Sequence, residues 1–147
     1  MKYRVLLAMA ALSFASMYVL MYAMVDRFAN VYPNVNQFYM AGLMTAPMIV
    51  IELALMRSMY KDKQRNLLVL GVSVAAGIAF FLGIRKQTAV GDVQFLKSMI
   101  PHHASALLMC EEASVTDPEI RKLCEGIRTG QQAEIDQMKA ILARLDK

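Results

Sequence analysis

The sequence has no tryptophan, and its 147 residues include two cysteines and two histidines. The cysteines are not arranged as C-x-x-C, so the usual redox motif is absent. No basic patch with interleaved aromatic residues occurs, and we therefore expect no nucleic-acid partner. Hydrophobic residues make up 57% of the chain, with a mean hydropathy of +0.39. This composition favours a membrane anchor with a small attached module over an ordinary soluble domain.

Three apolar runs predict membrane-spanning helices, at about residues 5–25, 38–56 and 67–84. As a helix the first run would be ~31 Å long, enough to cross a bilayer core. It follows Lys2 and Arg4 as a signal peptide would, but it is long and no small-x-small cleavage site follows it. We expect it to remain as an anchor, so that residues 1–88 form a three-span membrane domain. Residues 26–37, rich in turn formers, predict a polar linker between the first two spans.

The distribution of charge predicts the orientation in the membrane. Residues 1–90 hold nine basic and three acidic side chains, whereas residues 91–147 hold seven basic and nine acidic ones. Three spans place the chain ends on opposite sides, and the side with the N-terminus and the loop 57–66 carries six Lys and Arg. The positive-inside rule assigns this side to the cytoplasm. We expect a bacterial inner (plasma) membrane protein whose C-terminal domain is periplasmic or otherwise extracytoplasmic.

Residues 91–147 predict two helices, at about 92–113 and 117–145. The second helix opens with an aspartate cap, a proline at its first position and a glutamate in its first turn. The short connection makes the helices antiparallel neighbours, and positions whose numbers sum to about 234 should lie side by side. Pro101 either bends the first helix or marks its true start.

Seven side chains of this hairpin are candidate metal ligands. At ~100° per residue, thioether, thiol and imidazole groups share one side of the first helix, and the second helix adds a thiol and a thioether. The set is Met99, His102, His103, Met109, Cys110, Cys124 and Met138. These ligands suit Cu(I), with Ag(I) as a second ion, whereas Zn(II) would leave the methionines unexplained. The acidic residues are too scattered for the Glu-x-x-His pattern of di-iron bundles.

Structural alternatives exist for most of these residues. Methionine at an inner helical position is more often core filler than ligand. Cys110 and Cys124 would face an oxidising compartment, where a disulfide is as well supported as a dithiol metal site. Adjacent histidines leave a helix ~100° apart, so we expect at least one of them to be a ligand. In the second span, Met40, Met44 and Met48 recur every four residues, a pattern that favours packing or lipid contact over a metal path.

Two runs of the hairpin carry a family resemblance, Asp92-x-x-Phe95…Met99-Ile-Pro-His-His…Met109 and Asp117-Pro-Glu-Ile…Gln131-Gln-x-Glu-Ile-x-Gln-Met138. They resemble the signature of the domain-of-unknown-function family 305 over residues 91–145. Members are similar to ferritin-like helical bundles. Several are linked to periplasmic copper and silver binding or resistance through positions that match Met99, His102, His103, Met109 and Met138. Many members duplicate the unit to make a four-helix bundle, of which this hairpin would be half.

The sequence therefore predicts an all-α protein in which three transmembrane helices precede an antiparallel hairpin, half of a ferritin-like four-helix bundle. The expected function is Cu(I)/Ag(I) binding in buffering, trafficking or resistance, without enzymatic activity. The alternative is a helical interaction or oligomerisation module without metal, stapled by a Cys110–Cys124 disulfide. Because a lone hairpin is marginally stable, we expect it to form a homodimer or to dock on another helical partner.

Overall fold

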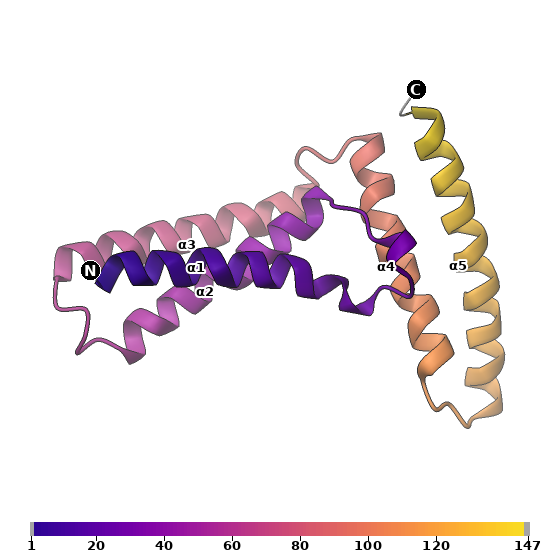
Figure 1. The fold of residues 1–147 in the computed structure, drawn as a ribbon, viewed down its shortest axis with the longest axis horizontal. Helices are drawn as coiled ribbons and strands as arrows, with labels where there is room; N and C mark the ends of the chain where they lie inside the picture. Colours follow the sequence, from indigo (N-terminus) through magenta and orange to yellow (C-terminus); the bar gives the residue numbers. More distant parts are fainter. Residues whose placement is uncertain (1, 146–147) are drawn as a thin grey trace. The chain divides into compact units, whose positions relative to one another are not determined.

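The computed structural model describes residues 2–145, which contain helices and no strand, so the predicted all-α class is confirmed (Figure 1). The elements are α1 (Lys2–Leu20), the 3₁₀ helices η1 (Met21–Met24) and η2 (Phe28–Asn30), α2 (Val35–Leu55), α3 (Lys63–Lys86), α4 (Asp92–Glu112) and α5 (Pro118–Leu145). The chain divides into two compact units, each described by itself. One holds α1, α2 and α3, and the other holds residues 22–35 with α4 and α5. Residues 146 and 147 of the predicted hairpin lie outside the described residues.

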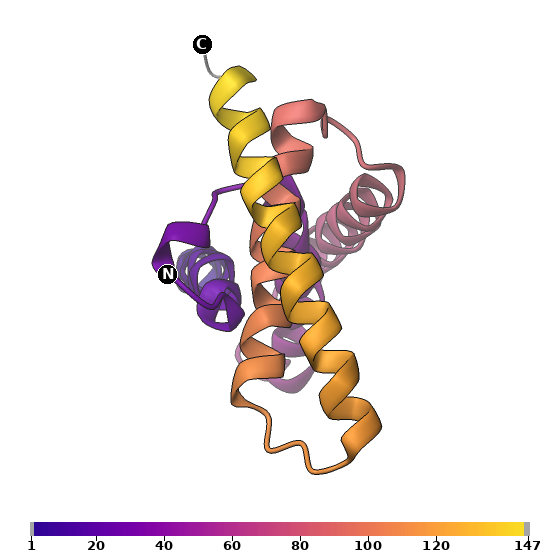
Figure 2. The same cartoon turned by 90° about the vertical axis from the view of Figure 1, so that its right-hand side faces the viewer.

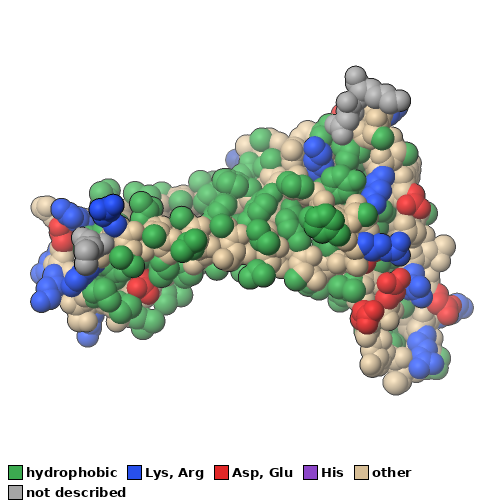
Figure 3. All heavy atoms as spheres, viewed as in Figure 1, with side chains coloured by type: hydrophobic (Ala, Val, Ile, Leu, Met, Phe, Trp, Pro, Cys, Tyr) green, Lys and Arg blue, Asp and Glu red, His purple; other side chains and the backbone are tan. Residues whose placement is uncertain are grey.

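Three helical segments, which make up most of the first unit, are long and apolar enough to cross a membrane: Lys2–Met24, Val35–Leu55 and Lys63–Lys86. Each begins a few residues before the apolar run that predicted it. In α3 the reason is a cap, because the Asp62 carboxylate accepts a hydrogen bond from the Arg65 N–H at 3.1 Å. Apolar side chains cover much of the visible surface of this unit (Figure 3), as expected for contact with lipid.

Glycines bring α2 and α3 close together. A Cβ at Gly42 would collide with the ring of Phe80, and a Cβ at Gly83 would lie 3.2 Å from the ring of Tyr39. Small residues at such positions allow aromatic rings to pack directly on the backbone of a neighbouring helix. Gly71, by contrast, has no atom from another part of the structure within 4 Å of the position of its missing Cβ. Contacts between a glycine of one helix and an aromatic ring of the other therefore hold α2 and α3 together.

Replacing Gly42 by valine should destabilise the three-helix unit by about 1–3 kcal/mol, because the new side chain overpacks the contact with Phe80. Thermal unfolding of the full chain in detergent measures this loss. Gly71→Val is the matched control, since it adds the same side chain where there is open space. Equal losses in the two variants would contradict the contact.

The second unit is built on the antiparallel pair α4 and α5 (Figure 2). The predicted start of α5 is confirmed, since Asp117 Oδ1 accepts hydrogen bonds from the N–H groups of Glu119 at 2.9 Å and Ile120 at 3.1 Å. Helix α4 passes through Pro101 without interruption, so the alternative in which Pro101 begins the helix is wrong. The core of this unit contains Leu96, Ile100, Ala104, Leu107, Ile135, Met138 and Leu142.

The segment 22–35, which includes most of the predicted polar linker, packs against α4. Ser98 Oγ donates to Asn34 Oδ1 at 3.3 Å, and the Val35 N–H donates to Gln94 Oε1 at 3.1 Å. Val25 and Tyr32 pack against the core of the hairpin. This segment therefore covers part of α4 that would otherwise be exposed to solvent.

Candidate metal centre

The seven candidate ligands fall at two levels of the hairpin. The first level, at the middle of α4, has Met99, His102 and His103, with Met138 in the adjoining core. The second level, near the turn, has Met109, Cys110 and Cys124. His103 and Cys110 are seven residues apart, or ~10 Å along a helix, so one ion cannot contact both levels. The arrangement allows at most one small site at each level.

His103 lies in the seam between α4 and α5, with 12% of its side chain exposed. Its Nδ1 atom is 3.0 Å from Glu134 Oε2, which is within ion-pair distance. Nδ1 does not, however, make a hydrogen bond with acceptable geometry. Burial lowers the pKa of His103 below its usual value, and the Glu134 carboxylate opposes this by raising it. The imidazole is therefore mainly neutral at pH 7, which is the form that binds metals.

His102 is exposed, and its ring centroid lies 5.9 Å from that of His103. Met99 precedes it by three residues and packs at the edge of the core. Side chains three residues apart on a helix are neighbours, with Cβ atoms ~5–6 Å apart. Met99 and His102 can therefore offer a thioether and an imidazole to the same ion.

The other two methionines occupy contrasting environments. Met138 is 9% exposed and belongs to the core, where its flexible side chain fills space between the helices. Met109 is 59% exposed on α4. Packing therefore explains why a methionine occurs at position 138, whereas it does not explain the exposed Met109.

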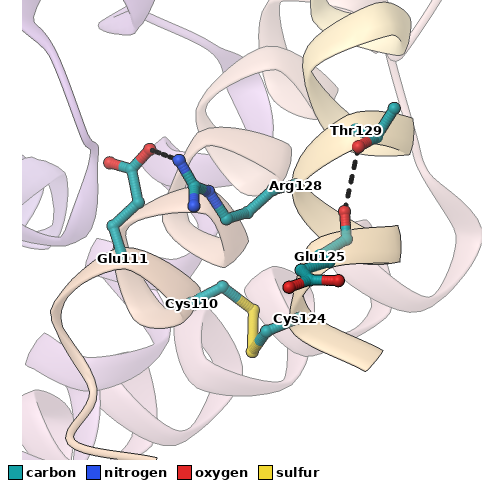
Figure 4. Close-up of a disulfide and its surroundings, with 6 residues drawn as sticks. All are labelled: Cys110, Glu111, Cys124, Glu125, Arg128 and Thr129. Atoms are coloured by element: carbon teal, nitrogen blue, oxygen red, sulfur yellow. Dashed lines mark hydrogen bonds and ion pairs between the residues drawn. A yellow bond between two sulfur atoms is a disulfide. The ribbon is translucent and has the colours of Figure 1, made fainter. Parts of the chain in front are cut away.

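Cys110 and Cys124 are joined by a disulfide, with their Cα atoms 5.3 Å apart (Figure 4). This pair has the register predicted from the length of the turn. In the disulfide state the two sulfurs are not thiolates, and they do not supply thiolate ligands to a metal. Beside the disulfide, Arg128 Nη2 lies 3.4 Å from Glu111 Oε1.

The register predicts that His103 lies level with Gln131, and the structure also places the imidazole against Glu134, one turn further along α5. The reason is that Cα–Cβ bonds tilt towards the N-terminus of each helix. In an antiparallel pair the side chains of the two helices tilt in opposite directions along the common axis. The His103 side chain therefore meets a residue of α5 that lies further from the turn than the residue level with its own Cα atom. The register alone therefore did not predict Glu134 as a partner of His103. A signal was present in the sequence, because Glu134 follows Ile127 by seven residues and lies on the same side of α5.

Among residues 2–145, no group of three or more His, Cys, Asp or Glu side chains could hold a metal ion. A site in this hairpin would therefore need methionine sulfur or ligands from a second chain. In the three-helix unit, Met40 and Met44 are 40% and 44% exposed. They point outward from that unit, as a lipid-facing interpretation requires.

Glu134→Gln should lower the pKa of His103 further, because it removes the carboxylate that raises this pKa and leaves the effect of burial. An NMR titration of the imidazole in the full-length protein in detergent measures the change. Glu119→Gln, at the start of the same helix, is the control and should leave the midpoint in place. A rise in the midpoint with Glu134→Gln would contradict the geometry.

Removing the disulfide with Cys110→Ser and Cys124→Ser should destabilise the closed end of the hairpin by about 3 kcal/mol, the value typical of a loop of this length. Hydrogen exchange of the α4 and α5 amides near the turn should then be roughly 100-fold faster. A reductant should have the same effect on the natural protein and none on the double variant. Unchanged exchange in both cases would show that packing alone holds the turn.

Comparison with known proteins gives a family and one relative. A family model described as "Domain of unknown function (DUF305)" matches residues 86–147. An uncharacterized protein of Acanthamoeba polyphaga mimivirus is 35% identical over 111 residues, which is 74% of this chain and 71% of that protein. This alignment is longer than the family match, so the similarity includes part of the apolar helices. No solved structure matches the chain.

Proposed function

The chain belongs to the DUF305 family, and from this membership and the side chains on its hairpin we propose that it is a membrane-anchored binding protein for Cu(I), with Ag(I) as a second ion. The observation that carries the proposal is the adjacency of Met99, His102 and His103 at the middle of α4. The metal is bound as cargo, and no catalytic step is involved. The biological role is copper buffering, trafficking or resistance.

The donor set fits a soft, monovalent ion. Thioether sulfur selects Cu(I) over harder cations, and neutral imidazole is a good additional ligand. Burial keeps His103 largely neutral at pH 7, so little proton competition opposes binding there. Met109 provides a further thioether near the turn, and Met138 would have to leave its core position to take part.

The proposal includes an orientation in the membrane. The N-terminus and the loop between α2 and α3 carry Lys2, Arg4, Arg57, Lys61, Lys63 and Arg65, which favour the cytoplasmic side of a bacterial inner membrane. The hairpin is then extracytoplasmic. A disulfide between Cys110 and Cys124 supports this placement, because disulfides persist in oxidising compartments.

Titration of the full-length protein in lipid nanodiscs with Cu(I), against a competing Cu(I) chelator, tests the function. The double variant Met99→Leu and His102→Gln should bind at least ~10-fold more weakly, a loss of ~1.4 kcal/mol. Its exposed and half-buried positions tolerate these substitutions. Met40→Leu with Met44→Leu removes two thioethers from the three-helix unit and should leave the affinity in place. Equal affinity of the ligand variant and the natural protein would overturn the proposal.

The alternative is a helical interaction module without metal, and the disulfide favours it because it would stabilise the hairpin without any ion. This function predicts no difference between the two double variants in the Cu(I) titration. It also predicts that added metal leaves the oligomeric state unchanged. The same titration therefore distinguishes the two functions.

A further inference from the structure

One face of the hairpin is largely apolar, and most of its side chains are exposed within residues 2–145. It consists of Phe95, Met99, His102, Ala106 and Met109 from α4, and Ile120, Leu123, Ile127, Gly130 and Glu134 from α5. We call these ten residues the open face. Phe95, Met109 and Leu123 are 52%, 59% and 61% exposed, high values for large apolar side chains.

The spacing of the open face is that of a helix-packing seam. Its residues on α4 follow one another by steps of four and three, and those on α5 by steps of three and four, the heptad pattern. This seam is distinct from the inner one, which includes Ile100 and Ile135. A helix in a four-helix bundle contacts two neighbours and needs two seams. Each helix here has two seams, and the pairing of α4 with α5 covers one.

The open face also holds three candidate ligands, Met99, His102 and Met109. His102 is the middle residue of α4, which spans Asp92–Glu112. In a symmetric contact between identical faces, residues at the centre of the face meet their own copies. A two-fold axis that passes beside the middle of α4 would bring two His102 imidazoles and two Met99 thioethers together, whereas one chain supplies one of each.

From this geometry we infer that the open face docks on the same face of a second copy, and that one Cu(I) or Ag(I) ion is shared between the copies. Met99 and His102 of each chain are the ligands. This inference rests on the proposed function and adds to it the partner that completes the site. Two hairpins joined in this way form a four-helix bundle with the metal near its centre.

The dimensions of the open face suit a dimer. Helix α4 has 21 residues, so the face is ~31 Å long and, across two helices, ~20 Å wide. Its projected area is ~600 Å², close to the ~800 Å² that a standard interface takes from each partner. Gly130 leaves room for close approach, since nothing lies within 4 Å of the position of its missing Cβ.

The charges of the open face also suit a second copy with a cation. Glu134 is the charged residue among its ten members, and the other charged side chains of α5 lie outside the set. Two copies would bring two Glu134 carboxylates into one contact. A monovalent cation held between the two carboxylates offsets their repulsion. A large charged partner docked on one copy would not do so for both copies equally. Metal binding should therefore strengthen the dimer.

Native mass spectrometry of the full-length protein, released from detergent with and without Ag(I), tests the shared site. We expect Ag(I) to raise the dimer fraction and to bind as one ion per two chains. Leu123→Lys should abolish the dimer and weaken Ag(I) binding at least ~10-fold, although leucine is not a ligand. Ala133→Lys adds the same charge at an exposed position of α5 outside the open face, and should change neither property.

Two results overturn the inference and separate it from the proposed function. One ion per chain, with affinity unaffected by Leu123→Lys, would leave metal binding in place and reject the shared site. No Ag(I) binding by the natural protein would reject the proposed function together with the shared site. If the natural protein binds no Ag(I) but forms a dimer that Leu123→Lys dissociates, the open face is an interface without a metal.

Discussion

The burial of Ile100 and Ile135 between α4 and α5 is the interaction on which the hairpin depends. Their exposed fractions are 0% and 1%, and the remaining core side chains surround them. This packing sets the register of the two helices. It places His103 in the seam beside Glu134, and it leaves Met99 at the edge of the core, next to the exposed His102. Whether a candidate ligand is buried or exposed follows from how far around its helix axis it lies from this core.

Two helices alone bury a single seam, and such a core is marginal for a unit of this size. The chain adds two supports. The disulfide closes the end near the turn, and the segment 22–35 covers part of α4 through Asn34, Tyr32 and Val25. His102 and Met109 stay exposed despite these two supports. The exposed candidate ligands, His102 and Met109, therefore contribute little to the packing of the hairpin, whereas Met99, His103 and Met138 lie in or beside its core.

Membrane anchoring would change the energetics of any contact between copies. Anchored chains are confined to two dimensions and share one orientation relative to the bilayer, which raises their effective concentration. A small interface of ~600–800 Å² can then suffice for association.

Much of the architecture could be predicted from the sequence, because it depends on local patterns. Apolar runs identified the three long helices to within a few residues, Asp117 marked the start of α5, and the short turn paired Cys110 with Cys124. The tertiary structure alone decided which candidate ligands are buried and which are exposed. Met138 and Met109 are chemically identical, yet one fills the core and the other faces outward. His103 meets Glu134 through the opposed tilts of two helices, and Asn34 reaches Ser98 across 64 residues. Such contacts depend on three-dimensional packing between distant segments, which local periodicity does not encode.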